Sequence, residues 1–399
     1  MRLNHLSITN FRNYARLELS FPARLSVFQG SNAQGKTNLL EAIHLLATAR
    51  SPRAVAEREL INWLAVDGPL PYARLAAEIG DGQSVERLEL VMELVSNGGA
   101  GPQVRKQVRI NGVPKRSLDL IGRLRVVLFL PEDVSLVSGA PGERRRYLDI
   151  ALCQVDAHYC RSLAAYNRAL SQRNTLLKRL RDEGGDSGQL TFWDHQLAEH
   201  GARVLHRRAV AVAALDELAR TRHRELSGGV EWLALAYLPS PAHPNGVSRR
   251  PEPASGAAYA AMPVPEITEL FAGHLRSQRV RDIGAGVTLS GPHRDDLAFL
   301  VDERDLRTYG SRGQQRTAAL ATRLAEVQMM RGITGESPLL LLDDVMSELD
   351  EVRRHALLDA LAGVDQALVT TTDWSDFSEE LLAQGRRYHV SAGRLTELS

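Results

Sequence analysis

The stretch Gly30-Ser31-Asn32-Ala33-Gln34-Gly35-Lys36-Thr37 determines how the rest of the chain is interpreted. It fits the phosphate-loop pattern, a glycine and four free positions followed by Gly-Lys-Ser/Thr. An apolar segment, residues 25–29, precedes it, and residues 38–46 carry apolar side chains at helical spacing. Strand, loop and helix together predict backbone N–H groups that bind phosphate oxygens. The alternative is a glycine turn between a core strand and a core helix.

Two side chains of this loop have the chemistry of a nucleotide triphosphate site. Lys36 is expected to reach the β- and γ-phosphates, and the Thr37 hydroxyl is expected to complete a Mg²⁺ shell. Only four of the 49 basic residues are lysines, and one of them stands in this loop. The choice is informative because the arginine fork does not replace a compact ammonium group there.

Composition limits the classes of protein that fit. The chain has 399 residues, 44% of them hydrophobic, which is enough for two or three cores. The net charge is +1, so any surface for nucleic acid must be local. Cys153 and Cys160, spaced seven apart on a predicted helix, favour buried thiols in a reducing compartment. No apolar run has the length of a membrane span, and a cytoplasmic location is expected.

The order of predicted elements suggests one lobe built from two distant parts of the chain. Short strands dominate up to residue 133, helical patterns run from 141 to about 226, and strands return near 287. We expect an ATPase lobe from residues 1–133 and 287–399, with a helical lobe, residues 134–286, inserted between them. Within the insertion, residues 182–189 predict the turn of a helical hairpin, and residues 239–265 predict a flexible loop.

An acidic strand supplies the second half of the expected site. Leu339–Leu342 is fully apolar and ends in Asp343 and Asp344. A strand buried beside the phosphate-loop strand would bring Asp343 to the Mg²⁺ shell. Asp344 is then placed to orient or deprotonate the attacking water. The alternative for Asp344 is a helix N-cap or a loop acid.

The segment Ser311-Arg312-Gly313-Gln314 resembles the signature motif of ABC-type ATPases. In that class the serine hydroxyl, the glycine N–H and the helix N-terminus contact the γ-phosphate bound to the opposite subunit. Ser311, Gly313 and Gln314 are therefore expected to contact a nucleotide held by a second copy. A plain capped helix is the alternative. Ser347 to Asp350 stand where that class has its subunit-contacting D-loop.

Five blocks of sequence together resemble the RecF family of recombination-mediator ATPases, which are related to SMC heads. The blocks are residues 10–14, 35–43, 290–297, 310–317 and 343–350. The resemblance runs nearly end to end and implies an α/β fold, an ABC-ATPase or SMC-head-like P-loop lobe with an inserted helical lobe. It also adds Arg12 and Asn38 to the expected nucleotide-binding residues.

Three departures from the wider ABC pattern bear on the chemistry. Asp344 stands where Glu is usual, one methylene shorter, so slow hydrolysis that acts as a timer is expected. Thr372-Asp373 stands where transporters carry a switch His. Pro131-Glu132-Asp133 lies at the position of a Q-loop but offers no Gln. His293 and Arg294, beside two carboxylates, favour a structural ion network.

A basic helix face is the predicted surface for DNA. Residues 143–182 hold nine Lys/Arg against four Asp/Glu, beginning with three successive arginines at 144–146. Arg161, Arg168, Gln172 and Arg179 share one helix face, which suits contact with phosphates of any sequence. A solvated charged face is the alternative.

The favoured interpretation is an ATP-dependent DNA-binding protein of recombinational repair. The resemblance implies that ATP and Mg²⁺ pair two subunits into a homodimer around duplex or gapped DNA, and that weak, DNA-stimulated hydrolysis releases it. It also implies partners RecO and RecR, which help load RecA, and no membrane. A transporter-type nucleotide-binding subunit and a P-loop kinase for a small molecule stay open as alternatives.

Overall fold

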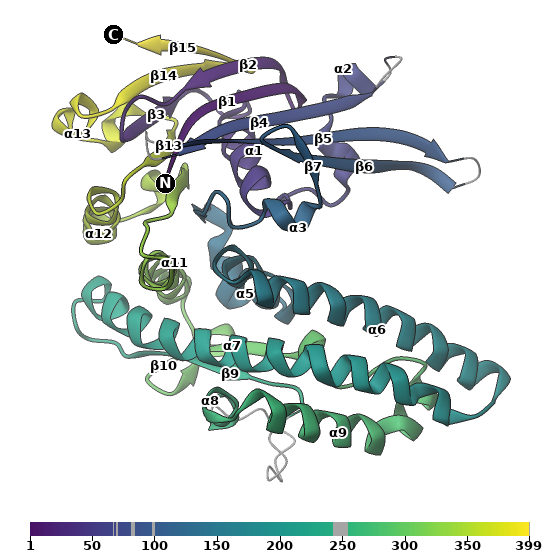
Figure 1. Ribbon diagram of the computed structural model, residues 1–399. Helices are drawn as coiled ribbons and strands as arrows, with labels where there is room; N and C mark the ends of the chain where they lie inside the picture. The colour runs from purple at the N-terminus through teal and green to yellow at the C-terminus, as the bar shows by residue number, and fades with distance from the viewer. Residues whose placement is uncertain (67, 69–70, 81–83, 98–99, 242–253, 399) are drawn as a thin grey trace. The chain divides into compact units, whose positions relative to one another are not determined.

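The computed structural model describes residues 1–66, 68, 71–80, 84–97, 100–241 and 254–398. The chain forms two compact units (Figure 1). The first comprises residues 1–133 and 326–399, and the second comprises residues 134–325. The first unit thus combines the purple and blue N-terminal strands with the yellow C-terminal strands of Figure 1.

An antiparallel six-stranded sheet forms one layer of the first unit, in the order β2-β1-β4-β5-β6-β7. Its strands are β1 Arg2–Phe11, β2 Tyr14–Ser20, β4 Tyr72–Gly80, β5 Val85–Asn97, β6 Ala100–Ile110 and β7 Val113–Lys115. A hairpin joins β6 and β7, and its turn residues Asn111 and Gly112 adopt φ values of 51° and 77°. Both angles are those of a two-residue hairpin turn with positive φ.

A second six-stranded sheet, in the order β15-β14-β3-β13-β12-β8, carries the phosphate-loop strand. Its strands are β3 Leu25–Gln29, β8 Val126–Phe129, β12 Leu339–Asp343, β13 Ala367–Thr371, β14 Arg386–Ser391 and β15 Arg394–Leu398. All neighbours pair in parallel except β14 and β15. Every residue of β12 is buried, as expected for a strand covered on both faces.

The helix after the phosphate loop, α1 Lys36–Thr48, belongs to the core shared by the two sheets. Leu39, Ile43 and Leu46 are fully buried in a cluster that also contains side chains of both sheets. Burying each such side chain contributes about 1.5–3 kcal/mol. The loop is therefore followed by a helix that packing holds firmly in place.

Shorter elements complete the first unit. They are η1 Glu57–Leu60, α2 Trp63–Val66, α3 Ser117–Leu120, η2 Pro131–Val134, η5 Met346–Glu348, α12 Glu351–Ala362, η6 Trp374–Asp376 and α13 Glu379–Ala383. The helix α11 Arg312–Thr334 crosses the division between the units at residue 325.

The second unit is mainly helical. Its longest elements are α5 Pro141–Val155, α6 Ala157–Glu183, α7 Leu190–Leu226 and α9 Val264–Ala285. The predicted helical hairpin is confirmed as α6 and α7, which pack against each other (Figure 1). A three-stranded sheet consists of β9 Leu233–Leu238, β10 Asp296–Val301 and β11 Arg304–Asp305. The shorter helices of this unit are α4 Ser135–Ser138, η3 Ser187–Gln189, α8 Ala254–Ala261, η4 Pro292–Arg294 and α10 Leu306–Tyr309.

Buried ion pairs hold the helices of this unit together. Arg173, fully buried, contacts Asp194 at 2.8 Å and Asp282 at 2.7 Å. Arg208 contacts Asp149 and Asp295, each at 2.8 Å. Removing one partner of such a pair leaves an uncompensated buried charge, which costs about 3–5 kcal/mol.

His293 belongs to this interior. Its ring contacts the Tyr166 hydroxyl at 2.7 Å and the Thr288 carbonyl oxygen at 3.0 Å. Burial lowers the pKa of His293 to about 4, so the imidazole is neutral at pH 7. These contacts give His293 a structural place in the unit, as its sequence context favours.

Several expectations differ from the structure. Residues 254–261 form a helix inside the expected loop of 239–265, and positions 242–253 of that loop lie outside the described residues. The strand expected from residue 287 begins only at Asp296. The expected boundary at 286/287 also differs from the division at 325/326, because β10 pairs along its length with β9 of the helical unit.

Candidate nucleotide-binding site

The phosphate loop turns between β3 and α1 with its lysine folded inward. Lys36 is 5% exposed, and its Nζ donates to the carbonyl oxygens of Gly30 at 2.5 Å and Ser31 at 3.1 Å. Gly35 has φ +116°, and a Cβ there would lie 2.6 Å from Asn13 Nδ2. Glycine is thus required at this position both by backbone angle and by space. In this structure these two carbonyl oxygens are the hydrogen-bond acceptors of the Lys36 ammonium group.

The C-terminal hairpin of β14 and β15 braces the loop from outside. Gln34 accepts a hydrogen bond from the backbone N of Ala392 at 2.7 Å through Oε1 and one from Gly393 at 2.9 Å through its carbonyl. A Cβ on Gly30 would lie 2.3 Å from the Val390 carbonyl oxygen. This hairpin was not predicted from the sequence, although Tyr388 and Val390 alternate with polar residues as in a half-buried strand.

The start of the chain supports the loop from the other side. Asn13 Nδ2 donates to the Gln34 carbonyl at 2.9 Å, and Asn38 Nδ2 donates to Asn13 Oδ1 at 2.8 Å. Tyr14 Oη donates to the Gly35 carbonyl at 3.0 Å. Asn38 therefore acts here through Asn13, and its contact with nucleotide stays a prediction. The loop residues Ser31, Asn32 and Ala33 are exposed and available for a ligand.

Arg12, one of the residues expected to bind nucleotide, forms an ion pair with a carboxylate of the chain. Its guanidinium binds Glu41 through two hydrogen bonds of 2.9 Å, and Glu41 is 2% exposed. Arg12 has φ +51°, in the left-handed region that side chains seldom adopt. The ion pair ties the turn after β1 to the middle of α1.

Asp343 lies at the carboxyl end of β12, next to the phosphate loop. Its Oδ1 accepts hydrogen bonds from Thr37 Oγ1 at 2.9 Å and from Thr370 Oγ1 at 2.8 Å. The loop and the acidic strand, predicted to form one site, therefore meet in the structure. The Thr37 hydroxyl donates its only proton to Asp343 and keeps lone pairs for another partner.

Asp344 has one oxygen without a partner. Its Oδ1 is buried and accepts no hydrogen bond within the described part of the chain. Burial raises the pKa of Asp344, Lys36 opposes that effect, and Asp343 adds to it. Its φ of 52° turns the residue out of the strand direction, with its backbone N bonded to Thr370. An acceptor that lacks its donor suits a group that binds water.

The residues fit a magnesium ion that is held partly by substrate. Within the described ranges, no group of three or more His, Cys, Asp and Glu side chains could hold a metal by itself. Magnesium typically takes one or two protein oxygens together with phosphate oxygens and waters. Thr37 and Asp343 offer that donor set.

One arginine near Asp343 was missed. Arg53 Nη2 lies 2.5 Å from Glu132 Oε1, and its Nη1 lies 3.8 Å from Asp343 Oδ2. Glu132, at the expected Q-loop position, belongs to η2 and pairs with this arginine. Nothing in the sequence spacing marks a pair that is 79 positions apart.

The signature segment belongs to the second unit, where it begins α11. The Ser311 hydroxyl accepts from the Gln314 backbone N at 3.2 Å, and Gln314 Oε1 accepts from the Ser311 backbone N at 2.9 Å. This reciprocal pair is a capping box. Ser311 and Gly313 are exposed, so the cap leaves both open to a ligand. Gln314 Nε2 also donates to Glu231 at 2.9 Å.

The expected basic face on α6 is only partly available. Arg161, Arg168 and Arg179 are exposed, and Arg179 donates to Gln189 at 2.6 Å. Two other arginines of the basic segment, Arg144 and Arg173, are buried in ion pairs. The sequence count therefore overstates the charge on the surface.

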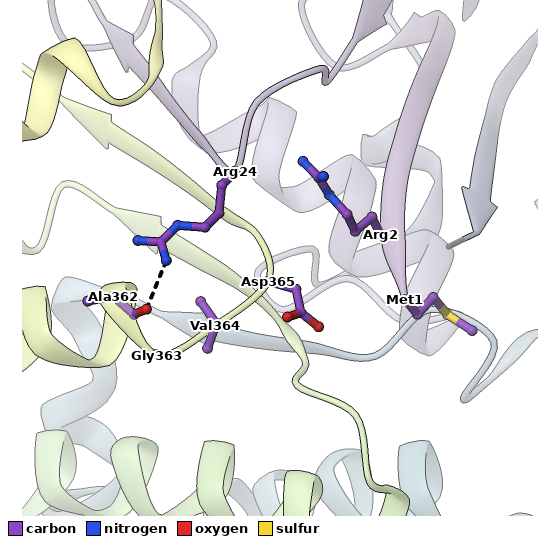
Figure 2. A pocket seen from close by; sticks show the side chains of 7 residues that line it. All are labelled: Met1, Arg2, Arg24, Ala362, Gly363, Val364 and Asp365. Atoms are coloured by element: carbon purple, nitrogen blue, oxygen red, sulfur yellow. Dashed lines mark hydrogen bonds between the residues drawn. The ribbon is translucent and has the colours of Figure 1, made fainter. Parts of the chain in front are cut away.

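A separate pocket has a volume of about 450 Å³, and Figure 2 shows the side chains that line it. Met1, Arg2, Arg24 and residues 362–365 line it, and Arg24 donates to the Ala362 carbonyl at 2.8 Å. It adjoins the amino ends of β3 and β13. Ligands of open α/β sheets bind at the carboxyl ends, where the phosphate loop lies.

Comparison with known proteins places this geometry in a family. The model of the RecF/RecN/SMC N-terminal domain matches residues 2–385. The DNA replication and repair protein RecF of Herpetosiphon aurantiacus is 44% identical over 98% of this chain and 99% of its own length. The chain belongs to the RecF family. This membership favours a repair ATPase over a transporter subunit or a small-molecule kinase.

Solved structures agree with the assignment to the RecF family. A RecF–ATP structure from the RecFOR pathway has a TM-score of 0.84 and 32% identity, covering 100% of this chain and 97% of its own. An Smc head bound to a domain of ScpA has a TM-score of 0.51, 15% identity and coverage of 100% and 98%, which supports the fold alone. In the described part of the chain, no helix is both long and apolar enough to cross a membrane.

Proposed function

We propose that this chain binds ATP with Mg²⁺, pairs with a second copy of itself on ATP, and so holds DNA during replication and recombinational repair. The observation that carries the proposal is the meeting of Lys36, Thr37 and Asp343 at the carboxyl edge of one sheet. The RecF relatives are replication and repair proteins, and one solved relative is an ATP complex.

Each residue of the first unit has a separate task in this proposal. Lys36 leaves its two carbonyl partners for the β- and γ-phosphates, and Thr37 and Asp343 bind the metal. Bound Mg²⁺ would neutralise charge on the transferred phosphoryl group. Asp344, with its unpartnered oxygen, orients the attacking water and accepts its proton. Because its side chain is short, turnover should stay far below tens per second, with or without DNA.

The second copy completes the γ-phosphate contacts in this proposal. Ser311 and Gly313 are exposed at the N-terminus of α11, a helix of 23 residues. The Ser311 hydroxyl accepts a hydrogen bond from the Gln314 backbone N and has its own proton to donate, and a helix N-terminus attracts a phosphate. Since these residues lie in the second unit, ATP held by one copy would bridge to this helix of another.

The exposed arginines of α6 are the proposed contact with duplex or gapped DNA. Arg161, Arg168 and Arg179 supply positive charge without base-reading geometry, as sequence-independent binding requires. The solved relative is described as part of the RecFOR pathway, which supports RecR and RecO as partners. Loading of RecA onto gapped DNA is the step that we propose for the complex.

The mass of the protein in solution, measured by light scattering, tests this function. The wild-type mass should double on addition of ATP and Mg²⁺. Ser311→Arg should still bind ATP and stay at the mass of one chain, because the arginine blocks the γ-phosphate of the other copy. Ser277→Arg, an exposed serine on α9, is the matched control and should dimerise normally. A wild-type protein that stays monomeric with ATP would overturn the proposal that ATP pairs two copies on DNA.

A further inference from the structure

Arg53 lies between two carboxylates, that of Asp343 in the acidic strand and that of Glu132 in η2. Its Nη1 is 3.8 Å from Asp343 Oδ2, and its Nη2 is 2.5 Å from Glu132 Oε1. The Asp343 side chain is 3% exposed, whereas those of Arg53 and Glu132 are 39% and 56% exposed. One guanidinium thus joins a buried carboxylate to a surface carboxylate.

The two oxygens of Asp343 have different partners. Oδ1 accepts hydrogen bonds from Thr37 and Thr370, while Oδ2 faces Arg53. Among the described residues, Arg53 is the one whose cationic nitrogen lies within 4.0 Å of Asp343. A buried carboxylate requires nearby positive charge, and without nucleotide Arg53 supplies part of that charge beside Lys36, which also interacts with Asp343.

A buried hydrogen-bond chain fixes the turn that carries Arg53. Ser51 Oγ accepts from the backbone N of Arg53 at 3.0 Å and of Ala54 at 2.8 Å. The same hydroxyl donates to Glu41 at 2.5 Å, and Glu41 is held in turn by Arg12. The backbone at Arg53 is therefore anchored to the phosphate-loop helix, while its side chain lies within 4.0 Å of both Asp343 and Glu132.

We propose that Arg53 substitutes for the metal's charge at Asp343 in the nucleotide-free protein. Arg53 and Mg²⁺ would then compete for the Asp343 carboxylate, and with the metal bound Glu132 would be the remaining acidic partner of Arg53. The inference rests on the proposed ATP and Mg²⁺ binding. Glu132 belongs to η2, whose last residue, Val134, is the first residue of the second unit. Metal occupancy would thereby change the ion pair at the end of the first unit.

The test is the benefit that Mg²⁺ gives to nucleotide binding. Affinity for a non-hydrolysable ATP analogue is measured by calorimetry in Mg²⁺ and in EDTA. The readout is the Kd in EDTA divided by the Kd in Mg²⁺. Arg53→Ala should raise this ratio about threefold to fivefold, the upper range for one partly exposed ion pair. Glu132→Gln should lower it about twofold, because Arg53 then keeps only Asp343 as its partner.

Two controls fix the interpretation. Arg53→Lys should keep the wild-type ratio, since it keeps the charge. Arg50→Ala removes an exposed arginine three positions away and should also leave the ratio unchanged. An unchanged or lowered ratio in Arg53→Ala overturns the inference, and so does a raised ratio in Glu132→Gln.

Folding and ligand binding are checked separately. If circular dichroism shows that Arg53→Ala does not fold, Glu132→Gln decides alone, because a lowered ratio supports the inference and any other result overturns it. A wild-type protein that binds no analogue in either buffer contradicts the proposed function. A wild-type protein that binds normally while the variants show no change in ratio contradicts only the role of Arg53.

Discussion

The Thr37 hydroxyl donates a hydrogen bond of 2.9 Å to Oδ1 of Asp343, which joins two residues 306 positions apart. Thr370 donates to the same oxygen at 2.8 Å. The carboxylate is thus already oriented toward the phosphate loop in the protein without ligand. Preorganised ligands of this kind reduce the ordering that binding would otherwise require.

Replacing Thr37 tests this relationship. Thr37→Val keeps the shape of the side chain but removes the donor to Asp343 and the oxygen expected to bind metal. ATP affinity in Mg²⁺ should fall about tenfold to a hundredfold, the cost of losing a hydrogen bond to a charged group. Thr37→Ser retains the hydroxyl and should stay near the wild-type affinity. Calorimetric titration decides, and equal affinities for Val and Ser variants would contradict the role.

The brace between Gln34 and the C-terminal hairpin should matter for nucleotide binding. Gln34→Ala removes the acceptor of the Ala392 N–H, so the loop loses one of its two bonds to the hairpin. We expect ATP affinity to fall about fivefold to tenfold, the worth of one hydrogen bond. Gln384→Ala, a residue just before β14, serves as the control in the same titration. Unchanged binding by Gln34→Ala would show that the loop holds its shape without this bond.

The raised pKa of Asp344 predicts how the rate of hydrolysis depends on pH. Burial raises the pKa of Asp344, so its carboxyl group takes up a proton at a higher pH than an ordinary aspartate, near 3.9. Only the ionised form can accept a proton from water, and the rate should therefore fall as pH decreases through the raised pKa. Single-turnover rates from pH 5 to 8 measure this, at saturating ATP. Asp344→Asn should abolish hydrolysis but keep ATP-dependent dimerisation, and a fast Asn variant would contradict the assignment.

The arginines of α6 predict how DNA binding depends on salt. Arg161→Glu with Arg168→Glu should weaken duplex binding at every sequence and reduce the slope of log affinity against log salt by about 2, one per lost phosphate contact. Fluorescence anisotropy at four salt concentrations gives the slope. Arg276→Glu, exposed on α9, is the control, with the same charge change for each substituted residue. Binding with an unaltered slope would place the DNA surface elsewhere.

The parts of the site that sequence could predict are those with a strict local pattern. The bounds of β3 agree with the apolar segment expected at 25–29, because a short apolar run beside a glycine loop leaves little choice. Arg53 could not be found this way, since its partners come from η2 and β12 and no periodicity links them. The positive charge on the surface of residues 143–182 was overestimated for a similar reason, because Arg144 and Arg173 pair with carboxylates that are distant in the sequence. Burial of charge depends on tertiary partners, which a residue count does not contain.

The pairing of β3 has a consequence for synthesis of the protein on the ribosome. Gln29 and Thr372, joined by a hydrogen bond, are 343 positions apart, and both strands that flank β3 come from beyond residue 366. At about 5–20 residues per second, the phosphate loop emerges roughly 20 to 70 seconds before its neighbours exist. During that interval α1 lacks its contacts with β12 and β13, while the continuous segment 134–325 can fold. The nascent chain should therefore depend on a chaperone until its last strands are made.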